Sequence, residues 1–177
     1  GTYFVTYNTS GNANWSSVSN SSIFLIVNKG APDLQIYVNN TTANATATYP
    51  NILELRGNSS TTVTPPTFSL FINDTVTNVV NSSNSSNNPA TINERLGNGT
   101  YRIVYNTSGN TNWSSGSNSS IFLLVNKGTP NVQAFIDDTS VNKTISYPTT
   151  VTIRGNSTTT TTPPTFNLSV VNASNVS

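Results

Sequence analysis

The sequence predicts an all-β chain of serial β-sandwich domains with a period of 98 residues. Three observations predict it: a long internal repeat, short runs in which apolar and polar residues alternate, and turn residues between those runs. The segment Tyr7–Gly30 returns as Tyr105–Gly128 with only three substitutions. The same shift aligns 79 residue pairs without a gap, and 43 of them are identical. A period of this length matches a whole small domain.

The predicted strands are short runs whose alternate residues are apolar, so that each strand has one apolar face. In chain order the runs lie at residues 34–38, 53–55, 68–72, 76–80, 92–96, 101–105 and 121–125. Seven short strands in one repeat are typical of an immunoglobulin-like (Ig-like) sandwich. The segment from Leu96 to Tyr101 resembles the corner of such folds at which a tyrosine hydroxyl bonds back to the backbone.

The repeat also predicts the domain boundaries. We expect residues 1–28 to be the C-terminal strands of a first Ig-like repeat, 29–126 a complete repeat, and 127–177 the N-terminal half of a further one. Two interpretations stay open. The sequence is a window on a longer tandem chain, or it is a subunit whose open half is completed by residues 1–28 of the next subunit. The second interpretation lacks a counterpart of residues 81–98.

The composition argues against several classes of function. The chain has no Cys, Met or His, 7% charged residues and a net charge of +1. It therefore has no thiolate or histidine zinc site, no histidine-based triad and no basic surface for nucleic acid. No apolar run approaches the roughly 20 residues of a membrane span. We expect no enzyme activity, no catalytic, cofactor or metal site, no nucleic-acid partner and no membrane span in this segment.

Acceptor triplets for N-linked glycosylation, Asn-x-Ser/Thr, are about twice as frequent as chance placement gives. Most lie in predicted turns or at strand ends, where a glycan can project into solvent. We expect covalent N-linked glycans, which supply the solubility that charged side chains usually give. The nineteen candidate sites are Asn8, Asn14, Asn20, Asn39, Asn40, Asn44, Asn58, Asn73, Asn81, Asn84, Asn98, Asn106, Asn112, Asn118, Asn142, Asn156, Asn167, Asn172 and Asn175.

The motifs GTYRIVYNTSGNTNWSS and VNKGTP resemble the Ig-like domain repeats of prokaryotic, especially archaeal, cell-surface proteins. The resemblance extends over the whole chain and implies an extracellular, structural component of a surface filament or stalk. Its partners would be copies of itself or neighbouring repeats, with cell-surface carbohydrate as a further class. The alternatives are a carbohydrate- or cell-binding adhesin module and an accessory domain of a secreted enzyme.

Two features predict contacts beyond a single domain. Trp15 and Trp113 lie in the loop before the last strand of their repeats, where a tryptophan either stacks on sugar or plugs the end of the domain. The last strands, IFLIV and IFLLV, are apolar on both faces, although an edge strand normally has one polar face. The residues on the second face are therefore expected at an assembly contact: Phe24, Ile26, Phe122 and Leu124.

Overall fold

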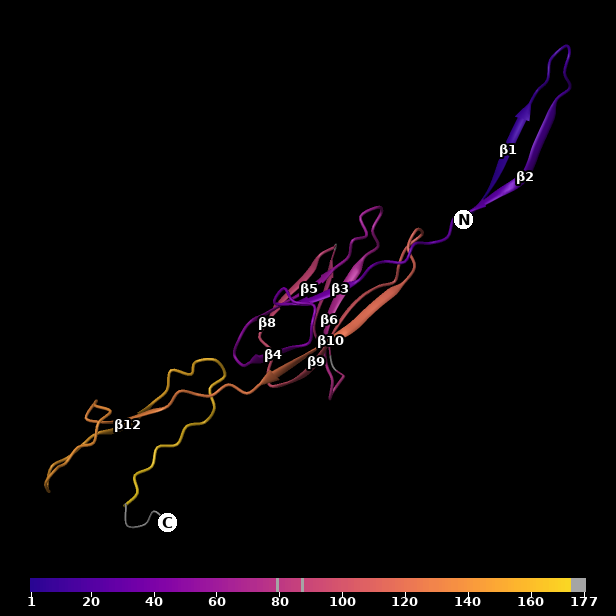
Figure 1. Cartoon of the computed structure of the whole chain (residues 1–177). Coiled ribbons are helices and arrows are strands. Elements are labelled where there is room, and N and C mark those ends of the chain that lie inside the picture. Colours follow the sequence, from indigo (N-terminus) through magenta and orange to yellow (C-terminus); the bar gives the residue numbers. More distant parts are fainter. Residues whose placement is uncertain (79, 87, 173–177) are drawn as a thin grey trace.

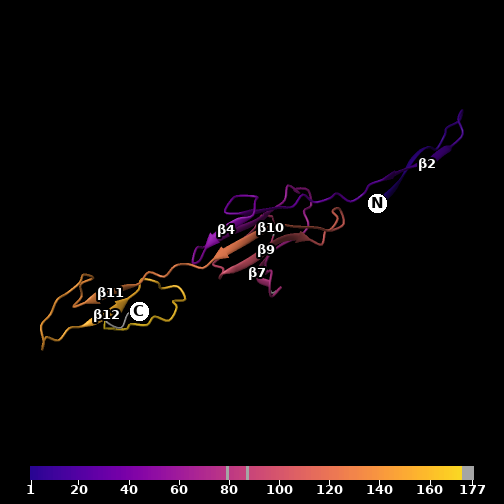
Figure 2. The ribbon, with the colours of Figure 1, turned by 60° about the horizontal axis from the view of Figure 1, so that its bottom comes forward.

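The computed structural model describes residues 1–78, 80–86 and 88–172, with the backbone alone for residues 81–86. These residues form β-strands and no helix, so the predicted all-β class is confirmed. Figure 1 shows three parts in series: an N-terminal hairpin, a middle part with most of the strands, and a C-terminal segment. The turned view in Figure 2 keeps the same order. The strands are β1 (Thr2–Thr9), β2 (Val18–Ile26), β3 (Gln35–Val38), β4 (Ala45–Thr48), β5 (Leu53–Asn58), β6 (Phe68–Asp74), β7 (Val80–Ser86), β8 (Ala90–Glu94), β9 (Gly99–Thr107), β10 (Gly116–Asn126), β11 (Gln133–Ile136) and β12 (Ile153–Asn156).

The middle part consists of two sheets around one core. The smaller sheet has the antiparallel order β3-β5-β8. The larger sheet has the order β4-β10-β9-β6-β7, in which β4 and β10 run parallel and the other neighbours run antiparallel. The chain changes from the smaller to the larger sheet between β3 and β4, so consecutive short strands belong to different sheets.

The core is built from the alternating apolar residues that the sequence predicts. Along β6, for example, Phe68, Leu70 and Ile72 are fully buried, while Phe71 between them is only half-buried. The Phe68 ring stacks on the Tyr105 ring with centroids 5.4 Å apart. The buried apolar residues are Ile36, Val38, Leu53, Leu55, Phe68, Leu70, Ile72, Ala90, Ile92, Leu96, Tyr101, Ile103, Tyr105, Ile121, Leu123 and Val125, all within residues 29–126.

Three details of the sequence prediction are wrong. Residues 75–77 form a turn rather than a strand, because the Asp74 carboxylate accepts hydrogen bonds from the Val76 and Thr77 amides. The strand next to this turn is β7, which runs through a Ser- and Asn-rich segment and pairs with β6. The strand predicted at 92–96 ends at Glu94, and Leu96 enters the core from the following loop. The short Ala- and Thr-containing strand β4 was not predicted.

The two flanking parts expose residues that are equivalent, in the 98-residue repeat, to core residues of the middle part. Tyr3 in β1 is 58% exposed, whereas its counterpart Tyr101 in β9 is 4% exposed. In the C-terminal segment β11 pairs with β12, as β3 pairs with β5, but Phe166 and Leu168 are exposed. The proposed boundaries at residues 28 and 126 stay predictions.

Candidate functional site

The linker that enters the middle part is bound by the loop between β9 and β10. The Gly30 amide donates a hydrogen bond to the Asn112 carbonyl oxygen, at 2.9 Å. The Ser114 amide in turn donates to the Gly30 carbonyl oxygen, also at 2.9 Å. The Lys29 ammonium group adds a bond to the Asn110 carbonyl oxygen at 2.7 Å. The linker is therefore paired like a short strand with a loop more than 80 residues further along the chain.

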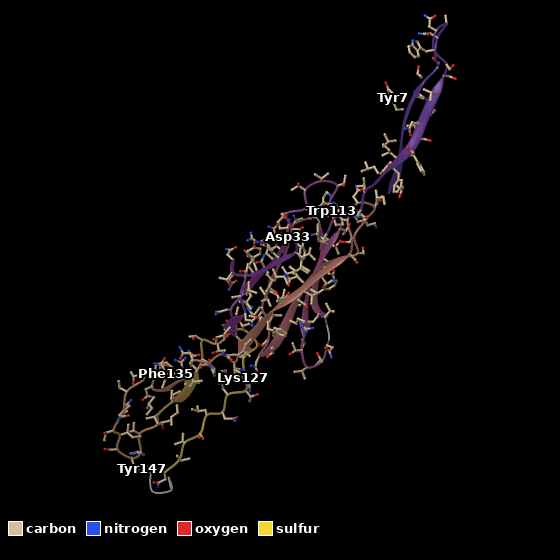
Figure 3. The ribbon with its side chains drawn as sticks, turned by 45° about the vertical axis from the view of Figure 1, so that its right-hand side comes forward. Tyr7, Asp33, Trp113, Lys127, Phe135 and Tyr147 are labelled. Atoms are coloured by element: carbon tan, nitrogen blue, oxygen red, sulfur yellow. The ribbon has the colours of Figure 1, made fainter. Side chains whose placement is uncertain are left out.

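Trp113 completes this joint by filling the space between the linker and a second loop. A Cβ atom at residue 30 would come within 2.7 Å of the indole ring, so only glycine allows the linker to lie this close. The Trp113 Nε1–H donates to the Val63 carbonyl oxygen at 2.9 Å. In Figure 3, Trp113 lies at the end of the middle part that faces the hairpin. Of the two alternatives for this tryptophan, the structure supports the one that plugs the domain end.

The Trp113 loop owes its shape to its own sequence rather than to the linker. Gly109 has φ +77°, in the left-handed region that favours glycine. The Asn110 side-chain oxygen accepts hydrogen bonds from the amides of Asn112 and Trp113. The hairpin loop repeats this arrangement, with φ +74° at Gly11 and the same bonds around Asn12. There Trp15 is 76% exposed, so the loop is formed without a bound linker.

At its other end the middle part meets the C-terminal segment around the second linker, near Lys127 (Figure 3). The Tyr49 hydroxyl donates to the Thr161 carbonyl oxygen at 3.2 Å and also contacts the Thr162 hydroxyl. A cavity of about 630 Å³ lies between Tyr49, Gly97, the linker and residues 158–162. Thr161 is the 98-residue counterpart of Val63, whose carbonyl oxygen accepts the Trp113 bond in the first joint.

The sequon asparagines differ in how their side-chain amides are used. The side-chain nitrogen of Asn98 donates to the Val125 carbonyl oxygen, that of Asn112 to the Thr64 hydroxyl and that of Asn118 to the Leu34 carbonyl oxygen. The side-chain oxygen accepts a backbone N–H in Asn20, Asn39, Asn44 and Asn118.

Exposure does not separate the candidate glycosylation sites. None of those whose side chains are described is buried: the residues are Asn8, Asn14, Asn20, Asn39, Asn40, Asn44, Asn58, Asn73, Asn98, Asn106, Asn112, Asn118, Asn142, Asn156, Asn167 and Asn172. Asn81 and Asn84 lie in β7, where only the backbone is described, and Asn175 lies outside the described residues.

The expectation from the sequence that the doubly apolar last strand is an edge strand is wrong. The strand, β10, lies between β4 and β9. Its second face points away from the core: Phe122 is 36% and Leu124 is 42% exposed. The Arg102 guanidinium lies over the Phe122 ring, 5.2 Å from its centroid. Phe24 and Ile26 are exposed on β2. Whether these residues form an assembly contact stays a prediction.

The acidic residues do not gather into a metal site, since the described part of the chain has no group of three or more His, Cys, Asp or Glu able to hold an ion. Asp137 forms an ion pair with Lys143, and Asp138 forms one with Arg154. The hydrogen bond from Lys143, followed by that from the Thr152 amide, lowers the pKa of Asp137. Both carboxylates therefore have a local cationic partner.

Within the residues described, no helix combines the length and hydropathy needed to cross a membrane. Comparison with known proteins gives no assignment: no family model and no curated protein matches this chain.

Proposed function

We propose that this chain is a structural part of an extracellular, N-glycosylated surface filament or stalk built from Ig-like units in series. The order of the strands supports the Ig-like interpretation: two sheets share one core, the first strands are divided between them, and a parallel pair joins an early strand to the last one. The Tyr101 hydroxyl bonds back to the Gly97 carbonyl oxygen, the corner that such sandwiches use.

The observation that carries the proposal is the joint at Gly30. A flexible linker leaves neighbouring domains free to rotate, because few contacts oppose the motion. Here the linker is instead paired with Asn112 and Ser114 and lies against Trp113. Each unit therefore receives the incoming chain in a fixed direction. Units that are joined in this way add up to a straight, stiff array, which is what a filament or stalk requires.

The dense sequons support the surface location and the glycan coat. With only 7% charged residues, the polypeptide has little charge of its own to keep it apart from other copies. Glycans on exposed asparagines would supply a hydrated layer instead. Copies of the same chain, or neighbouring repeats, are the proposed partners.

Mass spectrometry and electron microscopy of native material test this function. For these 177 residues, the intact mass should exceed the 18.8 kDa of the polypeptide by the mass of several sugar residues. Images should show continuous fibres with a regular axial repeat. A bare polypeptide mass, or separate particles without fibres, would contradict the proposal.

The serial arrangement has its own test, because the sequence repeat equates the last residue with residue 79. A copy of residues 80–126 added after Ser177 supplies the strands that residues 127–172 lack relative to the middle part. If the units are serial sandwiches, Phe166 and Leu168 become protected and the added tryptophan packs on Gly128. Unchanged exposure of Phe166 and Leu168 in the longer chain would show that residues 127–172 are not half of such a unit.

A further inference from the structure

The outer face of the larger sheet has an apolar stripe, formed by Phe122 and Leu124 of β10. Arg102 lies over part of the Phe122 ring, yet both side chains keep more than a third of their surface exposed. The neighbouring β4 places Thr46 beside Leu124 in the parallel register. The last strand has this apolar outer face in both copies of the repeat. Such a stripe needs a cover, because exposed apolar surface in a sheet promotes association.

Asn44 lies at one end of this stripe and is held there. Its side-chain oxygen accepts a hydrogen bond from the Phe122 amide at 2.9 Å, which extends the β4–β10 ladder by one residue. The carboxamide is planar, so fixing the oxygen also fixes the nitrogen. In the part of the chain that the structure describes, the Asn44 nitrogen has no hydrogen-bond partner. Residues Asn44, Ala45 and Thr46 form a complete sequon.

Asn118 provides the contrast, because it begins a sequon within β10, the strand that carries the apolar stripe. Its nitrogen donates to the Leu34 carbonyl oxygen at 2.7 Å, and its oxygen accepts from the amide and hydroxyl of Ser120. Both ends of this amide are therefore used in hydrogen bonds within the protein. A sugar on the Asn118 nitrogen would compete with the bond that ties β10 to Leu34, the residue before β3.

We propose that Asn44 carries an N-linked glycan whose first sugars lie over Phe122 and Leu124, whereas Asn118 stays unmodified as a structural amide. This inference rests on the proposed glycosylation of the chain. The donor is an activated glycosyl phosphate: the Asn44 nitrogen bonds to its anomeric carbon, the bond from that carbon to the phosphate oxygen breaks, the nitrogen loses one proton and the phosphate leaves as an anion. The apolar C–H face of the sugar then packs on the Phe122 ring.

Site-resolved mass spectrometry of glycopeptides from the native chain gives the first test. The peptide that contains Asn44 should carry sugar, and the peptide that contains Asn118 should be bare. A bare Asn44, or an occupied Asn118, would overturn the inference even if other sequons carry sugar and the proposed function stands. If no sequon carried sugar, the result would contradict the proposed function as well.

Variants at Thr46 test the cover itself, because they leave Asn44 and its bond to Phe122 in place. Thr46→Ala destroys the sequon and Thr46→Ser keeps it. In the glycosylating host, Thr46→Ala should bind several-fold more of a fluorescent hydrophobic dye, and Thr46→Ser should behave like the unchanged protein. Adding Phe122→Ser and Leu124→Thr to Thr46→Ala should abolish the extra binding.

The same variants show whether the stripe is covered by the glycan or by another copy of the chain. Fibres of normal length in Phe122→Ser, Leu124→Thr protein are expected if sugar is the cover. Equal dye binding by the two Thr46 variants, together with shortened fibres in the Phe122→Ser, Leu124→Thr protein, would assign the stripe to an assembly contact and overturn the inference.

Discussion

The Tyr101 hydroxyl donates a hydrogen bond to the Gly97 carbonyl oxygen at 3.0 Å, across the corner that leads into β9. The Tyr101 ring lies in the core, so this bond fixes the loop of residues 95–98 to the sandwich. Tyr101→Phe keeps the ring and removes the bond. We expect a loss of about 1 kcal/mol in the free energy of unfolding, measured by urea denaturation.

Tyr3→Phe is the matched control for this variant, because Tyr3 occupies the same place in the repeat but is exposed. It should leave the urea midpoint unchanged. Equal effects of the two substitutions would mean that the corner bond does not stabilise the sandwich.

The leucines at equivalent repeat positions, Leu70 and Leu168, give a second comparison. Leu70 is fully buried between the two sheets, whereas Leu168 is 53% exposed. Leu70→Ala should reduce the free energy of unfolding by about 3 kcal/mol, through lost burial and the cavity left behind. Leu168→Ala should change it by less than about 0.5 kcal/mol. A large effect of Leu168→Ala would show that residues 127–172 bury this side chain in solution.

Tryptophan fluorescence can report directly on the joint, since the chain has only two tryptophans. In a Trp15→Phe background the emission comes from Trp113, which is half-buried against Gly30. Gly30→Val should push the indole away from the linker and shift its emission to longer wavelength. Gly128→Val in the same background should cause no shift, because Gly128 lies against Tyr49. Identical spectra for all three proteins would mean that Trp113 does not hold the linker.

Alkaline pH should destabilise the middle part through its buried tyrosines. Burial raises the pKa of Tyr105 to about 12 and also raises that of Tyr101, both from the ordinary value of 10.0. Below pH 10 both hydroxyls keep their protons whether the chain is folded or not. Above it the unfolded chain loses these protons first, so the free energy of unfolding falls between about pH 10 and 12. Tyr105→Phe should reduce this fall in a melting series.

The free energy of unfolding should change much less at acidic pH than at alkaline pH. Hydrogen bonds from the Thr77 and Val76 amides lower the pKa of Asp74 below 3.8, and the Lys143 bond does the same for Asp137. Stability from a lowered carboxyl pKa is present above the unfolded value and disappears as the pH falls through the folded one. Both carboxyls are partly exposed to solvent, so screening keeps the effect small. The melting temperature should therefore be nearly constant from pH 4 to 9, and a steep fall at pH 5 would contradict this.

The sequence predicts the core strands of the middle part well, because each has an apolar face that must be buried. The alternation through Phe68, Leu70 and Ile72, for example, corresponds to β6. Strands β4 and β7 escape such a prediction, since both lie at the edges of the larger sheet. An edge strand is fixed largely by backbone pairing with its one neighbour, so Ala, Thr, Ser and Asn serve as well as apolar residues.

The joint could be predicted only in part. The spacing of the motif places Trp113 near the end of a domain, but which surface it meets depends on contacts between residues far apart in the chain. Gly30 approaches the indole from 83 positions earlier, and Val63 accepts its hydrogen bond from 50 positions earlier. The different uses of the amides of Asn44 and Asn118 are likewise invisible in the sequence, because both residues simply begin an Asn-x-Ser/Thr triplet.

The parallel pairing of β4 with β10 determines how the sandwich responds to tension along the chain. A pull enters through the linker at Gly30 and leaves through Asn126, at the end of β10. Since the two strands run in the same direction, the pull slides β4 and β10 past each other. The bonds of residues 45–48 with 123–126, together with those of Asn44 and Tyr49, are then loaded together in shear instead of being opened one after another. A stretched array of such units would resist extension until whole ladders break at once.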